Sequence, residues 1–198
     1  STVLGNISIA QQYVMPDEKI HEPLLLAERE TLRAKDLTDQ LMTFSSGSHG
    51  EKKVDSIEPV LKEAAEIALK GAPVESCFSF PEKPWLTEMD VSQIKQVFIN
   101  LFINAEHAMP EGGKINVAVE NKNIGPGDNL PLINGRYVKT IIQDQSIGIL
   151  NEHLQHIFDP YFKSKSKGSG IGLATIYSII KNHGGLVTVE SEFGKGTT

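Results

Sequence analysis

Apolar and polar positions recur along this chain with a helical period in some stretches and a strand period in others. The clearest helical stretch is 93–109, QIKQVFINLFINAEHAM. Its apolar side comprises Val91, Ile94, Phe98, Leu101, Ala105 and Ala108, and its polar side comprises Gln93, Asn100, Asn104 and His107. Asp90, with Gln93 three residues later, predicts an N-cap and a capping box. We therefore expect a core helix that turns two amides, one turn apart, toward a polar neighbour or a hard cation such as Mg²⁺.

Two further helical stretches begin the chain. Residues 1–13 carry one apolar stripe, and a longer helix is predicted from Pro23 to about Phe44. Its apolar seam consists of Ala27, Ala34 and Leu41 at seven-residue intervals, with Leu37 and Phe44 beside them. A seam this narrow does not stabilise a lone antiparallel hairpin, so we expect it to pack on a second copy of the chain or on the chain's own globular part.

The remaining pattern predicts an α+β domain. The polar, Gly/Ser-rich segment 45–53 marks a linker, which divides the chain into domains 1–47 and 48–198. Helices are predicted at 57–69 and 170–183, with one or two helical turns at 152–158. Strands are predicted at 74–80, 114–121, 137–143 and 186–190. These elements favour one mixed sheet with helices stacked on one side.

Composition narrows the class of protein. The 198 residues are 39% hydrophobic and 22% charged, as in a globular protein, and the net charge of −6 argues against binding to nucleic acid or to anionic membranes. The single cysteine, Cys77, excludes an internal disulfide and fits a reducing compartment, so we expect a cytoplasmic location. No apolar run reaches membrane-spanning length. Since the chain starts at Ser1 and stops in mid-motif at Thr198, we expect it to be a piece of a longer protein, in which a membrane anchor is possible.

Three short motifs follow the predicted helix 93–109. DQSIG, from Asp144 to Gly148, comes directly after a strand, where its carboxylate can accept a hydrogen bond from an exocyclic amine or simply form a turn. GSGIG, from Gly168 to Gly172, runs into a helix, where glycine N–H groups can approach phosphate or merely form a helix-entry loop. Between them, FDPYFKSK at 158–165 combines loop-pinning aromatics with lysines that could reach phosphate or form a basic surface.

The order and spacing of these motifs resemble the ATP-binding catalytic domain of two-component sensor histidine kinases, within the GHKL group. NLFINAEHAM resembles the N box, DQSIGI the DxGxG box, FDPYF the F box and GSGIGLA the GxGxG box, and the closing GG…GKGTT fits as well. This resemblance covers about 54–198. Residues 1–47, with LGNISIA and RAKDLTDQLMTFSSG, resemble the tail of the dimerisation and histidine-phosphotransfer hairpin. The implied fold is a two-layer α/β sandwich of the Bergerat type, preceded by a helical hairpin.

The resemblance also implies roles for individual residues. Asn104 would hold Mg²⁺ at the phosphates of ATP, assisted by Asn100, and Lys165 would neutralise the γ-phosphate. Asp144 would bind the adenine amino group, with close approach allowed by Gly148 and support from Thr197. The remaining nucleotide-binding set consists of Gly168, Gly170, Gly172 and Leu173 near the phosphates, and of Phe158 and Phe162 as anchors of the lid loop.

The implied activity is transfer of the γ-phosphoryl group to a histidine and then to an aspartate of a response-regulator receiver domain, by a homodimer joined through the hairpin. The acceptor histidine would lie in an H box upstream of Ser1, and none of the six histidines has such a context, so this fragment should bind ATP without phosphorylating itself. His183, before Gly184 and Gly185, is predicted to be structural.

The sequence departs from the family at two positions, and two alternative functions are considered. His107 stands where many relatives carry Lys or Arg near the phosphates, and no role is assigned to it. Ser146 replaces the family's usual glycine, which leaves a degenerate nucleotide-binding scaffold as an alternative. GHKL ATPases of the gyrase, mismatch-repair and heat-shock classes activate water with a glutamate one turn before the metal-binding asparagine. Asn100 occupies that position here, and an amide cannot act as a base.

Overall fold

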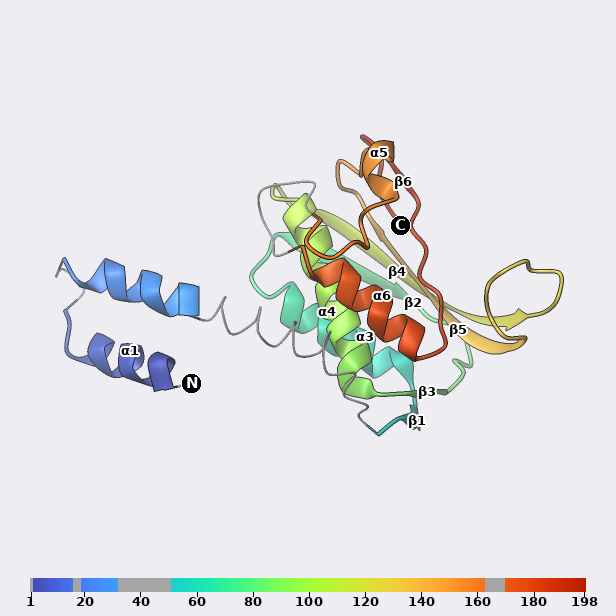
Figure 1. The fold of residues 1–198 in the computed structure, drawn as a ribbon, viewed down its shortest axis with the longest axis horizontal. Coiled ribbons are helices and arrows are strands. Elements are labelled where there is room, and N and C mark those ends of the chain that lie inside the picture. The colour runs from blue at the N-terminus through green and yellow to red at the C-terminus, as the bar shows by residue number, and fades with distance from the viewer. Residues whose placement is uncertain (1, 16–18, 32–50, 163–169) are drawn as a thin grey trace. The chain divides into compact units, whose positions relative to one another are not determined.

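The computed structural model describes residues 2–15, 19–31, 51–162 and 170–198 and divides into two compact units, Ser1–Gly47 and Ser48–Thr198 (Figure 1). The first unit contains helix α1 (Thr2–Gln12) and a helix over 21–31, joined by a hydrogen bond from Gln11 Nε2 to Glu28 Oε2 of 2.9 Å. No residue of α1 is buried. Most of the apolar seam predicted at 34–44, and the linker up to 50, lie outside the described residues.

The second unit contains the remaining elements. Its helices are α3 (Ile57–Ala68), α4 (Val91–Ala108), α5 (Asn151–Leu154) and α6 (Gly172–Asn182). Its strands are β1 (Lys53–Asp55), β2 (Val74–Ser79), β3 (Thr87–Met89), β4 (Gly113–Ile124), β5 (Gly135–Asp144), β6 (Ser191–Glu192) and β7 (Gly196–Thr197). The helices predicted at 57–69, 93–109 and 170–183 and the strands predicted at 74–80, 114–121 and 137–143 are therefore present, with small shifts at their ends.

The main sheet has the order β2-β4-β5 and is mixed, as predicted, because β2 is parallel and β5 antiparallel to β4. Small antiparallel ladders join β1 to β3 and β6 to β7. Ile115, near the start of β4, pairs with Asp144 at the end of β5. Since β4 follows α4 after a short turn, Asp144 lies at the same end of the sheet as the C-terminal end of α4.

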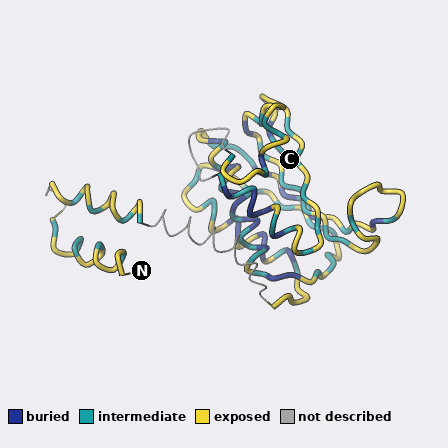
Figure 2. Tube along the Cα trace, viewed as in Figure 1, coloured by how far each residue is buried: buried dark blue, intermediate teal, exposed yellow. Residues whose placement is uncertain are grey.

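Helices α3, α4 and α6 cover one face of this sheet, with α4 between the other two (Figure 1). Their inward faces form the core (Figure 2). Leu61 of α3, Phe102 of α4 and Ile176 of α6 are fully buried, together with Ile115 of β4. Each such side chain contributes about 1.5–3 kcal/mol through burial, so this core fixes how the three helices lie against the sheet.

The N-cap residue of α4, Asp90, is also bonded to the C-terminal end of α6. Asp90 Oδ1 accepts hydrogen bonds from the N–H groups of Ser92 and Gln93, which confirms Asp90 as the predicted cap of α4. Its own N–H donates to Nε2 of His183 at 3.0 Å, and Nδ1 of His183 lies 2.8 Å from the carbonyl of Ile179. His183 therefore closes the C-terminal end of α6 onto the start of α4, in keeping with the structural role predicted for it.

The Asp90 carboxyl is stabilised in its charged form. Burial raises the pKa of Asp90, but the hydrogen bonds from the Ser92 side chain and from the backbone N–H groups of Gln93 and Ser92 outweigh it, and the proximity of His183 adds to their effect. The net pKa is lowered from its ordinary value of 3.8.

The strand predicted at 186–190 is wrong. Only Glu190 in that stretch is held by backbone pairing, through the exchange of two hydrogen bonds with Thr198, and the ladder proper begins at Ser191. A strand requires a neighbour for its backbone groups, and no described strand pairs with 186–189. Strands β1 and β3, with three residues each, were not predicted because they are too short to show an alternating pattern.

Candidate functional site

The two amides of α4 meet the N-terminal end of α6. A Cβ placed on Gly172 would lie 4.0 Å from Cγ of Asn100 and 4.0 Å from Nδ2 of Asn104. Asn104 is exposed, whereas Asn100 is only 5% exposed because α6 covers that side of α4. Asn100 therefore does not lie on an open polar face, as the helical period alone suggests, but within the contact between two helices.

The Asn100 amide is half satisfied. Its Oδ1 accepts a hydrogen bond from Nε2 of Gln96 at 3.2 Å, while its Nδ2 is buried and has no partner. An unsatisfied buried donor costs about 1–3 kcal/mol, and it lies beside a helix N-terminus, where partial positive charge favours an anion. Gln96 was not singled out from the sequence, although its position four residues before Asn100 was the available signal.

A second group of candidate residues surrounds Asp144 at the end of β5. Asp144 Oδ1 accepts hydrogen bonds from the N–H of Ser146 at 2.9 Å and from the N–H of Thr197 at 3.1 Å. No described residue bonds to Oδ2 of Asp144. The carboxylate is thus fixed by two backbone donors and keeps one oxygen that can accept a hydrogen bond from a ligand.

The β6–β7 hairpin packs closely on this group through glycines. Gly148 has φ of +72°, and a Cβ there would lie 2.4 Å from the carbonyl O of Glu192. Gly196 has φ of +108°, and a Cβ there would lie 2.2 Å from the carbonyl O of Asp144. Gly148 thus allows the hairpin to approach the loop after β5. The predicted close approach of Gly148 to an adenine base remains a prediction.

The hairpin is also tied to that loop by hydrogen bonds. Ser191 Oγ accepts from the N–H of Ile149 at 2.8 Å and lies 2.9 Å from Oγ1 of Thr197. Ser191 and Gly196 were not predicted as site residues. For Gly196 the closing GKGTT motif was the signal, but only contact with Asp144 reveals why a glycine is required there.

Ser146 fits its position without strain. It is 7% exposed, its φ is not positive, its N–H donates to Asp144, and its Oγ accepts from the N–H of Gly148 at 3.1 Å. A side chain is thus accommodated where the family usually has glycine, and its hydroxyl stabilises the turn.

The F-box aromatics pack around α5 and α6. Phe158 contacts Tyr177 of α6 at 5.7 Å between ring centroids, and Phe162 contacts His153 and His156. The N–H of Tyr161 donates to the carbonyl of Gly170 at 2.8 Å. Leu173 is half-buried and packs against the core. Lys165 and Gly168 lie outside the described residues.

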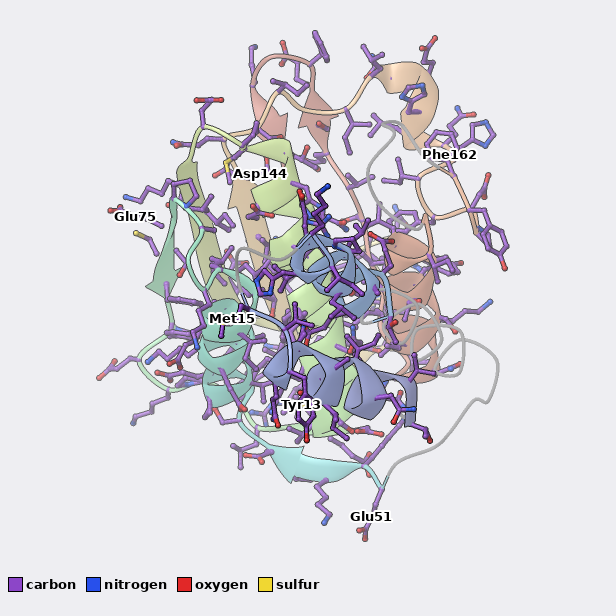
Figure 3. The ribbon with its side chains drawn as sticks, turned by 90° about the vertical axis from the view of Figure 1, so that its left-hand side faces the viewer. Tyr13, Met15, Glu51, Glu75, Asp144 and Phe162 are labelled. Atoms are coloured by element: carbon purple, nitrogen blue, oxygen red, sulfur yellow. The ribbon has the colours of Figure 1, made fainter. Side chains whose placement is uncertain are left out.

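Asn104, near the C-terminal end of α4, and Asp144, at the end of β5, belong to the same end of the domain, because β4 follows α4 after a short turn and pairs with the end of β5 there. Figure 3 labels Asp144 and Phe162 near this end and Glu51 at the opposite one. No hydrogen bond or ion pair between described residues joins the two groups. Two surface hollows lie elsewhere, one between α3 and β2 and one beside Trp85 and Arg136. The described residues contain no cluster of three or more His, Cys, Asp or Glu that could hold a metal.

The site offers two kinds of group to a ligand. The Asp144 carboxylate can accept a hydrogen bond from an amine-bearing ring, and the amides of Asn100 and Asn104 lie beside a helix N-terminus, which suits phosphates. Comparison with known proteins identifies the family. The chain belongs to the family of histidine kinase-, DNA gyrase B-, and HSP90-like ATPases, whose sequence profile matches residues 89–198. Within that family, the second unit is a catalytic domain of the histidine kinase type.

Individual relatives support this placement. The chain is 31% identical to sensor kinase CckA of Brucella abortus over 209 residues, which is all of this chain and 22% of that protein. Full-length ShkA in complex with AMPPNP shares the fold, with a TM-score of 0.76, 19% identity and coverage of 98% of this chain and 40% of that one. Histidine kinase ThkA in complex with the response regulator TrrA gives a TM-score of 0.67, 22% identity and coverage of 99% and 55%.

The chain thus spans about a fifth of the CckA sequence. Among its described residues, no helix combines the length and the apolar character that crossing a bilayer requires.

Proposed function

We propose that residues 48–198 bind Mg·ATP and transfer its γ-phosphoryl group to a histidine outside this sequence, from which a response-regulator aspartate would receive it. One observation carries the proposal: Gly172, at the start of α6, lies beside both Asn100 and Asn104. Phosphoryl transfer needs charge neutralisation and in-line placement more than covalent help, and a helix N-terminus flanked by amides suits that task.

Different residues of the chain would bind different parts of the nucleotide. The free oxygen of Asp144 would accept from the adenine amino group, with Thr197 as support, and the glycines of the GxGxG box would contact phosphate. The exposed amide of Asn104 fits Mg²⁺, which takes few protein ligands and otherwise binds phosphate oxygens and water. Bound there, Mg²⁺ would neutralise charge on the phosphates. Lys165 would add positive charge at the γ-phosphate, as its place after the F box implies.

The helical hairpin would supply the dimer contact. Its described part leaves large apolar side chains exposed: Val3, Ile9, Tyr13, Met15, Ile20, Leu25 and Leu26. Such a pair of helices gains little stability by itself, so burial against a second copy is the most direct way to cover them. The ThkA–TrrA complex supports the further proposal that a receiver domain is a partner.

The two alternative functions are less well supported. A degenerate scaffold rested on Ser146, which fits its position without positive φ and with its hydroxyl used. A water-activating ATPase would need a base where Asn100 stands, and an amide has no basic group at neutral pH.

The proposal is tested first by calorimetric titration of ATP into residues 48–198, with Mg²⁺ and with EDTA. Asn104→Ala should remove the Mg²⁺-dependent part of the affinity and leave the thermal unfolding temperature unchanged, because this side chain is exposed. His107→Ala, on the same helix and also exposed, is the matched control. Unchanged Mg·ATP affinity in Asn104→Ala would refute the metal role.

Transfer is tested separately, with γ-labelled ATP and a dimeric hairpin that carries an H box. Label on the H-box histidine, absent when the histidine is replaced by alanine, is the expected result. ATP binding without any label on that histidine would favour the scaffold function instead.

A further inference from the structure

Asn100 is held in one orientation by Gln96. Both residues lie on α4 one turn apart, and Nε2 of Gln96 donates to Oδ1 of Asn100 at 3.2 Å. The oxygen of the Asn100 amide is thereby directed along α4 toward Gln96. The nitrogen, Nδ2, is buried and unpartnered.

The surroundings of Nδ2 suit an anion. Asn100 Cγ lies 4.0 Å from the position of a Gly172 Cβ, at the first residue of the eleven-residue helix α6. The dipole of this helix favours negative charge at its N-terminal end. An amide NH₂ group adds two donors, and it cannot bind a cation, because its lone pair is delocalised into the carbonyl group.

We propose that Gln96 is a positioning residue that turns the NH₂ group of Asn100 toward the phosphates of the bound nucleotide, so that Asn100 donates to a phosphate oxygen and is not a ligand of Mg²⁺. The inference rests on the proposed function, since it assigns a contact within the same nucleotide site. It separates the two asparagines into different chemical roles: Asn104, exposed, would hold the metal, and Asn100, buried, would bind phosphate directly.

Two variants of Gln96 test this. Gln96→Met keeps the size of the side chain but cannot donate to Oδ1, so the Asn100 amide is free to rotate. ATP should then bind about three- to tenfold more weakly, the equivalent of one neutral hydrogen bond. Gln96→Glu goes further, because its carboxylate accepts from Nδ2 and turns the oxygen of Asn100 toward the phosphates. It should weaken ATP binding more than Gln96→Met does. Gln155→Met, at the exposed C-cap of α5, is the control for the change in composition.

The decisive readout is the dependence on metal. If Asn100 donates to phosphate, Gln96→Met should lower ATP affinity by the same factor in Mg²⁺ and in EDTA, whereas Asn104→Ala should lower it in Mg²⁺ alone. In the wild type, the ¹⁵N-labelled side-chain amide signal of Asn100 should shift on addition of ATP in EDTA. If the role of Gln96 were merely structural, Gln96→Met would lower the unfolding temperature, but the Asn100 amide signal would respond to ATP as it does in the wild type.

Each outcome separates the two proposals. A wild-type domain that binds no ATP refutes the proposed function itself. A wild type that binds ATP, together with a Gln96→Met variant that shows no loss of affinity, overturns the role of Gln96. A loss that appears only in Mg²⁺ also overturns it and makes Asn100 a ligand of the metal.

Discussion

Replacing Asp144 with asparagine separates binding of the adenine ring from maintenance of the fold. In the structure, Oδ1 of Asp144 accepts from the N–H groups of Ser146 and Thr197, and Oδ2 has no described partner. Asparagine has the same shape, and its carbonyl oxygen can take the place of Oδ1. Its NH₂ group would then replace Oδ2, so an acceptor becomes a donor at the single atom proposed to contact the ligand.

The expected magnitudes differ for folding and binding. The two backbone hydrogen bonds remain but lose the help of the negative charge, which should lower the free energy of unfolding by about 1 kcal/mol. The bond from the adenine amino group to a carboxylate contributes about 1.5–3 kcal/mol, and asparagine offers that amine another donor. The dissociation constant for ATP should therefore rise roughly 10- to 150-fold.

Inosine triphosphate provides the matched control. It carries an oxygen acceptor where adenine has its amino group, so the NH₂ group of the Asp144→Asn variant can donate to it, whereas the wild-type carboxylate repels it. Competition binding with ATP and inosine triphosphate should show the preference for adenine lost or reversed. Urea unfolding checks that the domain is intact. An unchanged ATP affinity in a folded variant, or equal losses for both nucleotides, would remove Asp144 from the adenine contact.

Three further changes test how the site is supported. Gly196→Ala should lower the free energy of unfolding by about 1–3 kcal/mol, because its Cβ would lie 2.2 Å from the carbonyl O of Asp144. Gly194→Ala, also at positive φ but with nothing within 4 Å, should cost only about 1 kcal/mol of backbone strain; equal losses in urea unfolding would contradict the steric argument. Asp90→Ala should remove about 1 kcal/mol of N-cap stabilisation. Because the pKa of Asp90 is lowered in the folded state, that stabilisation is complete above 3.8 and is lost as pH falls through the lowered pKa, so urea curves of variant and wild type should converge in strong acid, and a constant gap would refute the assignment. His183→Ala leaves the N–H of Asp90 without its acceptor and should cost about 1–3 kcal/mol, with faster hydrogen exchange at that amide; unchanged exchange would argue against the contact.

Most of the fold could be predicted because its elements carry strong local patterns. Helix α4 has a clear apolar side and a cap at Asp90, and β4 and β5 alternate enough to define a mixed sheet with their neighbours. The stretch 186–190 alternates just as well, with Val187 and Val189, yet it is not a strand, because alternation describes a side-chain preference and not the presence of a partner. Pairing is a tertiary property and could not be predicted from that segment.

The candidate site divides in the same way. The motifs located Asn100, Asn104, Asp144 and the glycines, since residue type and spacing are local. Whether an amide faces solvent or a second helix depends on where α6 packs, so the helical period placed Asn100 on an open polar face although it is 5% exposed. The need for glycine at Gly196 is equally non-local, because the obstructing atom is the carbonyl O of Asp144.

The contact between α4 and α6 has opposite character at its two ends, and this difference indicates where a ligand belongs. At one end the polar groups satisfy each other: Asp90 caps α4, and His183 accepts from Asp90 and bonds to Ile179. At the other end Asn100 keeps a buried donor without a partner, next to Gly172 at the start of α6. The bonds between Asp90 and His183 fix how α6 lies along α4, and they therefore also fix the position of Gly172 beside Asn100. We infer that the unsatisfied Asn100 amide is held ready for a ligand. Its chemistry, a donor at a helix N-terminus, requires the ligand group to be an acceptor and favours a negative charge, which a phosphate oxygen supplies.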